Sequence, residues 1–284
     1  MEYHTLKNIF KPISNNLAYC NGRVKIAPNG GVLEILYTSK PVFNCGGFEP
    51  QNTSDKKPNF WCQQEAEIEA EIEAAEAKEK TPNAQARARA YKRVFDYSMC
   101  NEGVFDLFIT MTCDGAKVDR YDIDKVYWDK LRHFLDNRVQ RKGLKYIIVP
   151  ELHKDGAVHF HGLINSGAVQ LKDSGHKVWK RGLSRGKHIY NIADWKVGFT
   201  TAVKLSGDHE NVAKYITKYI TKQTSGGMIG GRYYYHGGKL LQPKYHYLNF
   251  LEEPKGRAID LEEAGLRVVY VTDLSNCRYE EVSL

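Results

Sequence analysis

The stretch Lys145–Asn165, KYIIVPELHKDGAVHFHGLIN, decides how the rest of the chain is interpreted. It contains two apolar runs, 145–151 and 157–165, with a Lys-Asp-Gly turn signal between them. This pattern predicts two antiparallel strands joined by a tight turn. His159 and His161 are two residues apart in the second run, so a strand would point both imidazole rings to the same face of its sheet.

The register of this hairpin determines which other side chains join the two histidines. If the loop is the three residues 155–157, His153 lies opposite His159 and Glu151 lies opposite His161, and all four share one face. A two-residue loop would turn Glu151 and His153 to the other face. The glycine in the loop suits the left-handed position that a three-residue loop needs, so we expect the first register.

The donor types in this set indicate a class of metal. Two histidines and a carboxylate with open coordination positions suit Mn²⁺ or Mg²⁺ better than a closed zinc site. Imidazole ligands favour Mn²⁺ in intrinsic affinity, whereas abundance favours Mg²⁺. We therefore expect a divalent cation of one of these two kinds.

The segments around the hairpin predict a mixed fold. Two amphipathic helices are expected, 122–141 with Asp122 as N-cap and Gly143 as stop, and 208–223. Further strands are expected at 104–113 and 198–205. The resulting order is strand, helix, strand, strand, strand, helix. It predicts an α+β fold, an antiparallel sheet of the split βαβ (ferredoxin-like) kind with the helices packed on one face.

The remainder of the chain is expected to form extensions of this domain. We expect an irregular segment at 1–60 with one or two short strands, a charged helical segment at 61–100, a central domain at 101–250, and a C-terminal extension at 251–284 with a strand near 266–271. Glu65–Lys80 holds seven glutamates and two lysines, which predicts an exposed or partly disordered helix. Pro82 permits a fresh helix start.

The second expected helix carries a tandem repeat, Tyr215-Ile-Thr-Lys218 followed at once by Tyr219-Ile-Thr-Lys222. Residues four apart on a helix share one face, so the two tyrosines are expected at the edge of the buried side. The helix should bury Val212, Ile216 and Ile220 and carry a stripe of lysines beyond the tyrosines: Lys214, Lys218 and Lys222. Tyrosines at the rim of an ordinary amphipathic helix are the alternative interpretation. Phenols have a pKa near 10, and neighbouring lysines are expected to favour the phenolate.

The charge balance points to a polyanionic partner. The chain has 41 basic and 34 acidic residues, a net charge of +7. Nucleic acid is the commonest partner of a basic protein. The window Leu171–Tyr190 has a net charge of +5 and contains Trp179, which predicts a flexible basic loop for DNA contact, although a solvated surface loop is the alternative. The expected DNA-binding residues are Lys172, Lys177, Lys180, Arg181, Arg185, Lys187 and Lys214.

The residues His159-Phe160-His161, Tyr215 with Tyr219, and the strand Phe108-Ile-Thr-Met-Thr112 together resemble the three motifs of HUH (His-hydrophobe-His) endonucleases. The likeness is greatest to rolling-circle replication initiators of plasmids and small single-stranded DNA phages, and it covers residues 84–250. It implies metal-dependent nicking of single-stranded origin DNA, with a 5′-phosphotyrosine and a free 3′-OH as products and later strand rejoining.

The resemblance also implies roles for individual residues. Glu151, His159 and His161 would hold the ion, with His153 as a rival for the third place. Tyr215 or Tyr219 would be the nucleophile, and Lys218 and Lys222 match the lysine three places after the tyrosine. Because the sequence has no G-x-x-x-x-G-K-[ST] pattern, we expect the helicase and polymerase to come from the host's replication machinery.

Alternatives of other kinds stay open at this point. A transposase or a relaxase would use the same chemistry. A non-catalytic nucleic-acid-binding module would need aromatic platforms on a strand, for which Phe108 and Phe160 are the candidates. No apolar run of 18 residues occurs and the first residues lack the layout of a signal peptide, so we expect no membrane partner and a cytoplasmic location in a bacterial or phage-infected cell.

Overall fold

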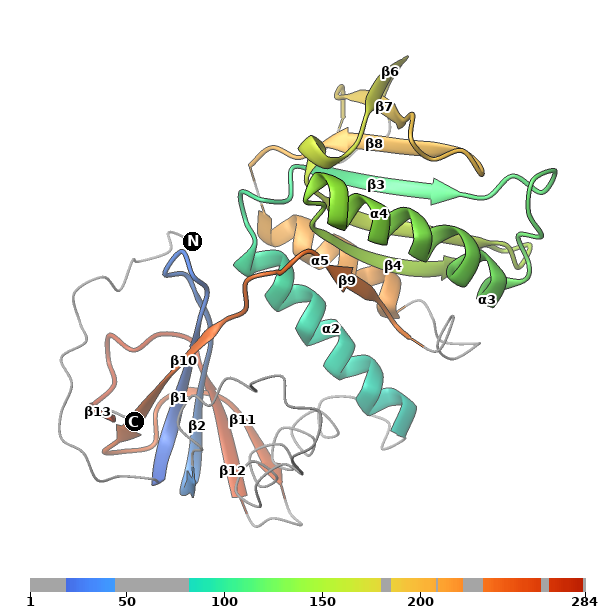
Figure 1. Cartoon of the computed structure of the whole chain (residues 1–284). Coiled ribbons are helices and arrows are strands. Elements are labelled where there is room, and N and C mark those ends of the chain that lie inside the picture. The colour runs from blue at the N-terminus through green and yellow to red at the C-terminus, as the bar shows by residue number, and fades with distance from the viewer. Residues whose placement is uncertain are drawn as a thin grey trace. The chain divides into compact units, whose positions relative to one another are not determined.

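The structure is a computed structural model that describes residues 19–43, 82–179, 185–207, 209–221, 232–261 and 266–282. The chain divides into two compact units, one formed by Met1–Ala88 with Gln242–Leu284 and the other by Arg89–Leu241. Figure 1 shows the elements of both. We had expected the central domain to run to residue 250, but strand β10 (Lys244–Phe250) falls in the first unit. The acidic segment 65–80 lies outside the described residues.

The first unit contains a six-stranded antiparallel sheet built from both ends of the chain. Its strand order is β11-β12-β2-β1-β10-β13. The bounds are Tyr19–Ile26 (β1), Val32–Phe43 (β2), Lys244–Phe250 (β10), Gly256–Leu261 (β11), Leu266–Val271 (β12) and Tyr279–Val282 (β13). The expected strand at 266–271 is confirmed, and β1 and β2 are the strands expected within 1–60. The segment 251–284 is therefore part of a sheet whose other strands are β1 and β2, from the N-terminal part of the chain, and β10.

The second unit contains a seven-stranded antiparallel sheet, in the order β6-β7-β8-β3-β5-β4-β9. The bounds are Leu107–Thr112 (β3), Tyr146–Leu152 (β4), Val158–Ile164 (β5), Leu171–Lys177 (β6), His188–Ile192 (β7), Thr200–Lys204 (β8) and Tyr235–Gly237 (β9). The expected strands β3, β4, β5 and β8 are confirmed. Among the described helices, α2 spans Pro82–Cys100, α5 spans His209–Thr221, and a single 3₁₀ turn, η2, spans Ser166–Ala168.

The window Leu171–Tyr190, predicted as a flexible loop, is instead mostly a strand pair. Strands β6 and β7 pair antiparallel, with Lys172 opposite Asn191 and Asp173 opposite Tyr190. The prediction failed because β6 is an edge strand in which every residue is half-buried or exposed, so the sequence shows none of the alternation of apolar and polar residues that marks a strand. Residues 180–184 lie outside the described part.

The helical segment after β3 begins and ends where its capping residues predict. The Asp122 side chain accepts a hydrogen bond from the backbone N–H of Lys125 (3.0 Å), and Gly143 ends the helix in the left-handed conformation with φ 65°. Between these ends the segment is α3 (Ile123–Lys125), a π-helix η1 (Val126–Leu131) and α4 (Arg132–Lys142). The sequence pattern did not predict the π-helical turn. No helix in the described ranges is long and apolar enough to cross a membrane.

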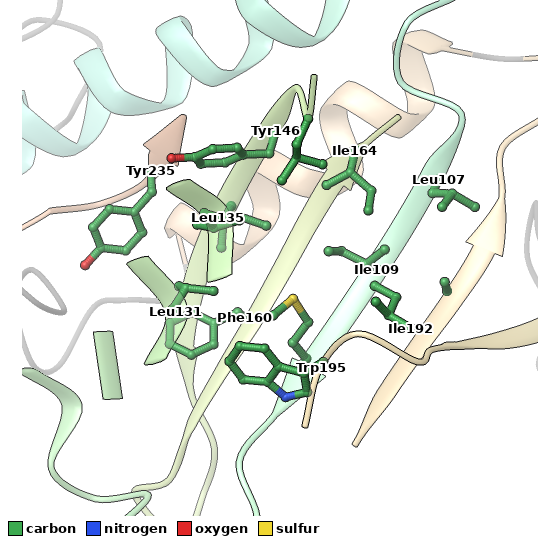
Figure 2. Close-up of a cluster of buried hydrophobic side chains, with 14 of the residues drawn as sticks. Leu107, Ile109, Leu131, Leu135, Tyr146, Phe160, Ile164, Ile192, Trp195 and Tyr235 are labelled. Atoms are coloured by element: carbon green, nitrogen blue, oxygen red, sulfur yellow. The ribbon is translucent and has the colours of Figure 1, made fainter. Parts of the chain in front are cut away.

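The two faces of the second sheet have different covers. Phe160 of β5 is fully buried with Leu131 and Leu135 in the main hydrophobic core (Figure 2). The next residue, His161, points to the other face, where the Tyr219 ring of α5 stacks on it. Helices α4 and α5 therefore pack on opposite faces (Figure 1), and our expectation that the helices share one face is wrong.

The handedness of the connections explains this arrangement. The strand pairings make β3 parallel to β4, and β8 parallel to β9, but the two pairs run in opposite directions. The connections β3–α4–β4 and β8–α5–β9 cross the sheet in the same sense along the strand order. Because crossovers between parallel strands are right-handed, reversing the strand direction moves the connecting helix to the opposite face.

Candidate active site

The face of the second sheet that α5 partly covers collects the histidines and their polar neighbours. Strand register places Glu151 of β4 and Thr112 of β3 on either side of His159. His161 is two residues further along β5, and Thr110 of β3 lies directly opposite it. Paired residues in an antiparallel sheet share a face, so all five side chains belong to one surface, which we call the site face.

The hairpin register differs from the expected one by two residues. Glu151 pairs with His159, whereas we had expected it opposite His161. The loop is 154–156, because the backbone N–H of His153 donates to the carbonyl of Ala157 (2.8 Å). The Asp155 side chain accepts from the Ala157 N–H (3.1 Å), which stabilises this earlier turn, and the loop glycine has φ 87° as expected. A shift of two residues preserves the face, so Glu151 still points towards the histidines.

His161 is held on both ring nitrogens. Its Nε2 lies 2.8 Å from Oε2 of Glu151, and its Nδ1 is hydrogen-bonded to Oγ1 of Thr110 (3.1 Å). The residue is only 7% exposed, and both contacts are partly buried. Thr110 had entered the sequence analysis only as part of a strand. A threonine directly across from a histidine would have indicated this contact, but only once the strand register was known.

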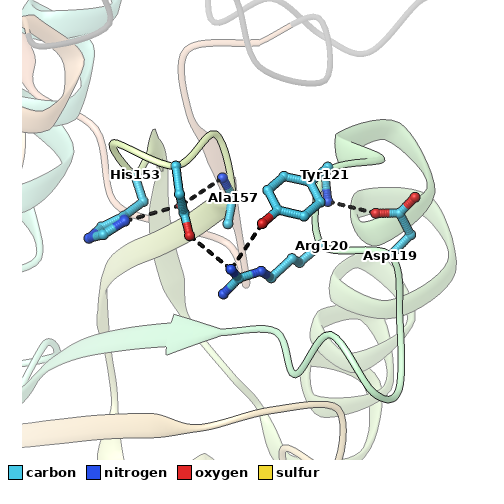
Figure 3. A network of polar contacts seen from close by, with 6 residues as sticks. Asp119, Arg120, Tyr121, His153 and Ala157 are labelled. Atoms are coloured by element: carbon cyan, nitrogen blue, oxygen red, sulfur yellow. Dashed lines mark hydrogen bonds and ion pairs between the residues drawn. The ribbon is translucent and has the colours of Figure 1, made fainter.

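His153 and His159 form a second pair. Their rings stack with centroids 4.8 Å apart. Nδ1 of His153 contacts Oδ1 of Asp155 (3.1 Å), and Oδ2 of Asp155 accepts from Arg120 (2.8 Å), as Figure 3 shows around the labelled Arg120 and His153. Burial, assisted by the nearby His153, lowers the pKa of His159 below its usual value. His159 is therefore neutral near pH 7, the form in which imidazole binds metals.

Helix α5 lays its apolar side against β4 and β5. The residues buried on this side are Ala213, Ile216, Thr217 and Ile220, whereas Val212, expected at the centre, is only half-buried. The two tyrosines are not equivalent: Tyr215 is 48% exposed, but Tyr219 is 7% exposed and does not lie at the solvent edge as expected.

The tyrosines and His161 converge. The Tyr219 ring lies parallel to the His161 ring, with centroids 3.8 Å apart and an interplanar angle of 12°. The Tyr219 hydroxyl donates to the Tyr215 hydroxyl at 2.9 Å. Phe108 supports both rings, with its centroid 5.2 Å from that of Tyr215 and 6.4 Å from that of Tyr219. The structure thus brings the imidazole of His161, the Glu151 carboxylate and both phenols into one continuous cluster.

The electrostatics of Tyr219 differ from expectation. Burial, together with the adjacent Tyr215 hydroxyl and the Glu151 charge, raises the pKa of Tyr219 far above that of a free phenol. The expectation that neighbouring lysines favour its phenolate is therefore wrong for this residue, because burial of the side chain disfavours the charged form.

The predicted basic residues within the described ranges fall into two groups, one on α5 beside the tyrosines and one on or next to the strand pair β6–β7. Nζ of Lys214 pairs with Glu210 at 2.6 Å, and Lys218 is exposed on α5. The strand pair β6–β7 lies at the edge of the sheet, where β6 is four strands and β7 three strands from β5; at roughly 4.8 Å per strand these separations are about 19 Å and about 14 Å. This strand pair and the residues next to it carry Lys172, Lys177, Arg185 and Lys187, together with Trp179, which is 84% exposed. Lys180, Arg181 and Lys222 lie outside the described residues.

The donor set fits a divalent cation only in part. Across the described ranges, no three His, Cys, Asp or Glu side chains are grouped closely enough to hold a metal ion. Oε2 of Glu151 and Nε2 of His161, however, lie 2.8 Å apart. Two ligands at right angles around an ion, each about 2.1 Å away, would be about 3.0 Å apart. This pair therefore has the spacing and the chemistry of two adjacent ligands, with His159 and His153 nearby on the same face.

One of three comparisons with known proteins covers the segment that contains this cluster. No curated protein and no solved structure matches the chain. A family model does match residues 106–224, the segment from the start of β3 to just past α5, which carries the histidine strand and both tyrosines. The model describes the replication-associated protein ORF2 family, so this part of the chain is similar to replication-associated proteins.

Proposed function

We propose that this protein initiates rolling-circle DNA replication by nicking single-stranded origin DNA with a tyrosine, in the manner of an HUH endonuclease. The observation that carries the proposal is the contact between the two motifs: the Tyr219 ring stacks on His161 at 3.8 Å and its hydroxyl bonds to that of Tyr215. Residues 106–224, which match a replication-associated family, contain this contact.

The reaction is a transesterification. A phenolic oxygen attacks the phosphorus of a DNA phosphodiester, the P–O3′ bond breaks, and O3′ leaves with its electron pair and takes up a proton. The phenol loses its own proton, so charge and atoms balance. The products are a 5′-phosphotyrosine, which conserves the bond energy for rejoining, and a free 3′-OH that primes synthesis.

Residues around the phenols would prepare the phosphate. When bound, a divalent cation, Mn²⁺ or Mg²⁺, supplies charge neutralisation on a non-bridging phosphate oxygen. Glu151 and His161 would hold it as adjacent ligands, with His159 or His153 completing the set. Thr110 fixes the orientation of the His161 ring through Nδ1. Lys218, exposed on α5, would add positive charge beside the tyrosines, and Lys222 is proposed for the same role from its place in the repeat.

The remaining basic residues would bind the DNA on either side of the scissile phosphate. The β6–β7 strand pair is too far from His161 to contact the reacting phosphate, so its charges would hold a more distant stretch of the strand. Lys180 and Arg181 are proposed as DNA-binding residues from the sequence, and Lys214 would contribute from α5. The host's polymerase would then extend the DNA strand from the 3′-OH while the host's helicase separates the strands.

A purely DNA- or RNA-binding module is less well supported. Its aromatic platform would need Phe108 and Phe160 exposed on the sheet. Phe160 is fully buried in the core, and the Phe108 ring is flanked by Tyr215, Tyr219 and His161. Phe160 therefore has no exposed face for base stacking, and the half-buried Phe108 ring is already in contact with three other rings. Transposases and relaxases share the chemistry proposed here. The family model that matches residues 106–224 is of replication-associated proteins, which favours a replication initiator.

The test is formation of a covalent protein–DNA adduct. Single strands with a random central region and a 3′-terminal fluorophore are incubated with the protein and Mn²⁺ or Mg²⁺, then run on a denaturing protein gel. We expect a labelled band at the size of the protein plus a DNA fragment, and its sequencing reports the nick site. The absence of such a band with either metal would refute the proposal. A band that persists in EDTA would refute the metal requirement.

Matched variants assign the band to the site. Tyr215→Phe combined with Tyr219→Phe should abolish the adduct, whereas Tyr270→Phe, which removes a hydroxyl in the other unit, should not. His161→Ala should abolish metal-dependent cleavage but leave salt-sensitive DNA binding. Equal loss of cleavage and binding in His161→Ala, with a lowered melting temperature, would show a folding defect and would remove the support for its role as a ligand.

A further inference from the structure

The two tyrosines of the tandem repeat have the same neighbours in sequence but different environments. Each begins a Tyr-Ile-Thr-Lys unit on α5. Tyr215 is 48% exposed and Tyr219 is 7% exposed. One helical turn of separation causes the difference, because α5 packs on β4 and β5 so that Tyr219 is pressed onto His161 whereas Tyr215 is not.

Tyr219 is constrained at both ends of its side chain. Its ring is stacked on His161 with a centroid separation of 3.8 Å. Its O–H is donated to the Tyr215 oxygen at 2.9 Å. An attack by Tyr219 on phosphorus would require the hydroxyl to give up this bond and a phosphodiester to approach a side chain that is almost completely buried.

Tyr215 has the complementary properties. Its oxygen accepts the hydrogen bond from Tyr219, so a donor is already aimed at the atom on which negative charge would develop. The edge-on contact with Phe108, 5.2 Å between centroids and 65° between planes, limits the motion of its ring. Nearly half of the side chain remains open to an incoming strand.

We propose that Tyr215 makes the first attack on DNA and that Tyr219 is a positioning residue that acts through its hydrogen bond to the Tyr215 oxygen. This inference rests on the proposed nicking function. In the first step the Tyr215 oxygen forms the bond to phosphorus, the P–O3′ bond breaks, and O3′ gains a proton while Tyr215 loses its own. Tyr219 keeps its proton throughout and holds the attacking oxygen beside His161.

The test compares single-turnover adduct formation in Tyr215→Phe and Tyr219→Phe, with the strand recovered from the nicking experiment as substrate. Tyr215→Phe should form no adduct in the time that wild type needs for completion. Tyr219→Phe keeps the ring that stacks on His161 and loses one hydrogen bond to a developing charge, so its rate should fall about 10- to 100-fold. Its affinity for the strand, measured by fluorescence anisotropy, should be unchanged, which separates positioning from binding.

Several results would overturn this assignment. They are an adduct in Tyr215→Phe that forms as fast as in Tyr219→Phe, an unchanged rate in Tyr219→Phe, or no adduct at all in a Tyr219→Phe protein whose melting temperature matches wild type. If wild type itself forms no adduct, the nicking function fails. If wild type forms one that Tyr215→Phe retains, only the order of the tyrosines is wrong.

Direct mapping of the modified residue needs a suitable protease. Trypsin would release Tyr215–Lys218 and Tyr219–Lys222 as identical Tyr-Ile-Thr-Lys peptides, so a tryptic mass cannot tell the two sites apart. Cleavage after glutamate keeps both tyrosines on one peptide that begins at Asn211, and fragmentation of that peptide locates the nucleotide. We expect it on Tyr215 after the first turnover, and its location on Tyr219 would refute the proposal.

Discussion

Replacing Thr110 by valine removes one hydroxyl from the site and keeps the branched shape of the side chain. The lost contact is the 3.1 Å hydrogen bond to Nδ1 of His161, which is 7% exposed and has Glu151 at its other nitrogen. A partly buried hydrogen bond of this kind contributes about 0.5–1.5 kcal/mol, and the ring nitrogen left without it adds a further cost. Partners of this type typically change metal affinity by about 10- to 100-fold. We expect Mn²⁺ to bind Thr110→Val about tenfold more weakly.

Titration calorimetry with MnCl₂ in the absence of DNA measures this change. Thr201→Val is the matched control. Thr201 is an exposed residue of β8 that pairs with Thr110, so this substitution makes the same chemical change on the same face of the sheet. The melting temperature should fall by only about 2–4 °C in Thr110→Val, as the loss of about 1 kcal/mol implies, and should hardly change in Thr201→Val. A dissociation constant for Thr110→Val within twofold of wild type would refute the orienting role of Thr110, and no Mn²⁺ binding by wild type would refute the metal site.

Three further outcomes follow from the structure. Phe160→Ala should lower the free energy of unfolding in urea by about 3–5 kcal/mol, because Phe160 is fully buried, whereas Phe199→Ala at a site 73% exposed should change it little; equal effects would contradict the core assignment. In metal-free protein, the NMR titration midpoint of His159 should lie below 6.5. Because the unfolded chain then binds the proton more readily than the folded protein, stability should fall as the pH drops below about 6.5. A midpoint above 6.5 would be inconsistent with the burial of His159. Four basic residues around β6 and β7 are neutralised together: Lys172, Lys177, Arg185 and Lys187. The slope of log binding constant against log salt concentration for single-stranded DNA should become shallower by up to about 3. An unchanged slope would show that these residues do not contact the DNA.

Local sequence patterns predicted much of the second unit. The positions of β3, β4, β5, β8 and α5, and the capping of the helical segment by Asp122 and Gly143, follow from periodicity and from residues adjacent in the chain. The strands β6 and β7 escaped prediction because an exposed edge hairpin lacks apolar alternation. Strands β10 and β13 were missed as well, because each pairs with a segment more than 20 residues away. Strand β11 was missed because it is a short run without a clear period.

The candidate site was predictable in composition but not in geometry. The His-x-His spacing determines that His159 and His161 share a face, and helical spacing places Tyr215 and Tyr219 on neighbouring turns. Neither pattern contains the hairpin register, which differs from expectation by two residues and moves Glu151 from directly opposite His161 to diagonally across from it. The register depends on where the turn closes, which Asp155 determines through its bond to the Ala157 N–H.

The sequence by itself therefore determined which residues are available for chemistry: two histidines on one strand, a nearby carboxylate, and two phenols on one helix. Only the tertiary structure decided that α5 covers the face opposite α4, that His161 lies against Tyr219, and that Tyr219 is buried while Tyr215 stays open to solvent. The physical reason is that side-chain direction follows from the local backbone repeat, whereas the side of the sheet on which a helix packs depends on strand direction and the handedness of a long-range connection.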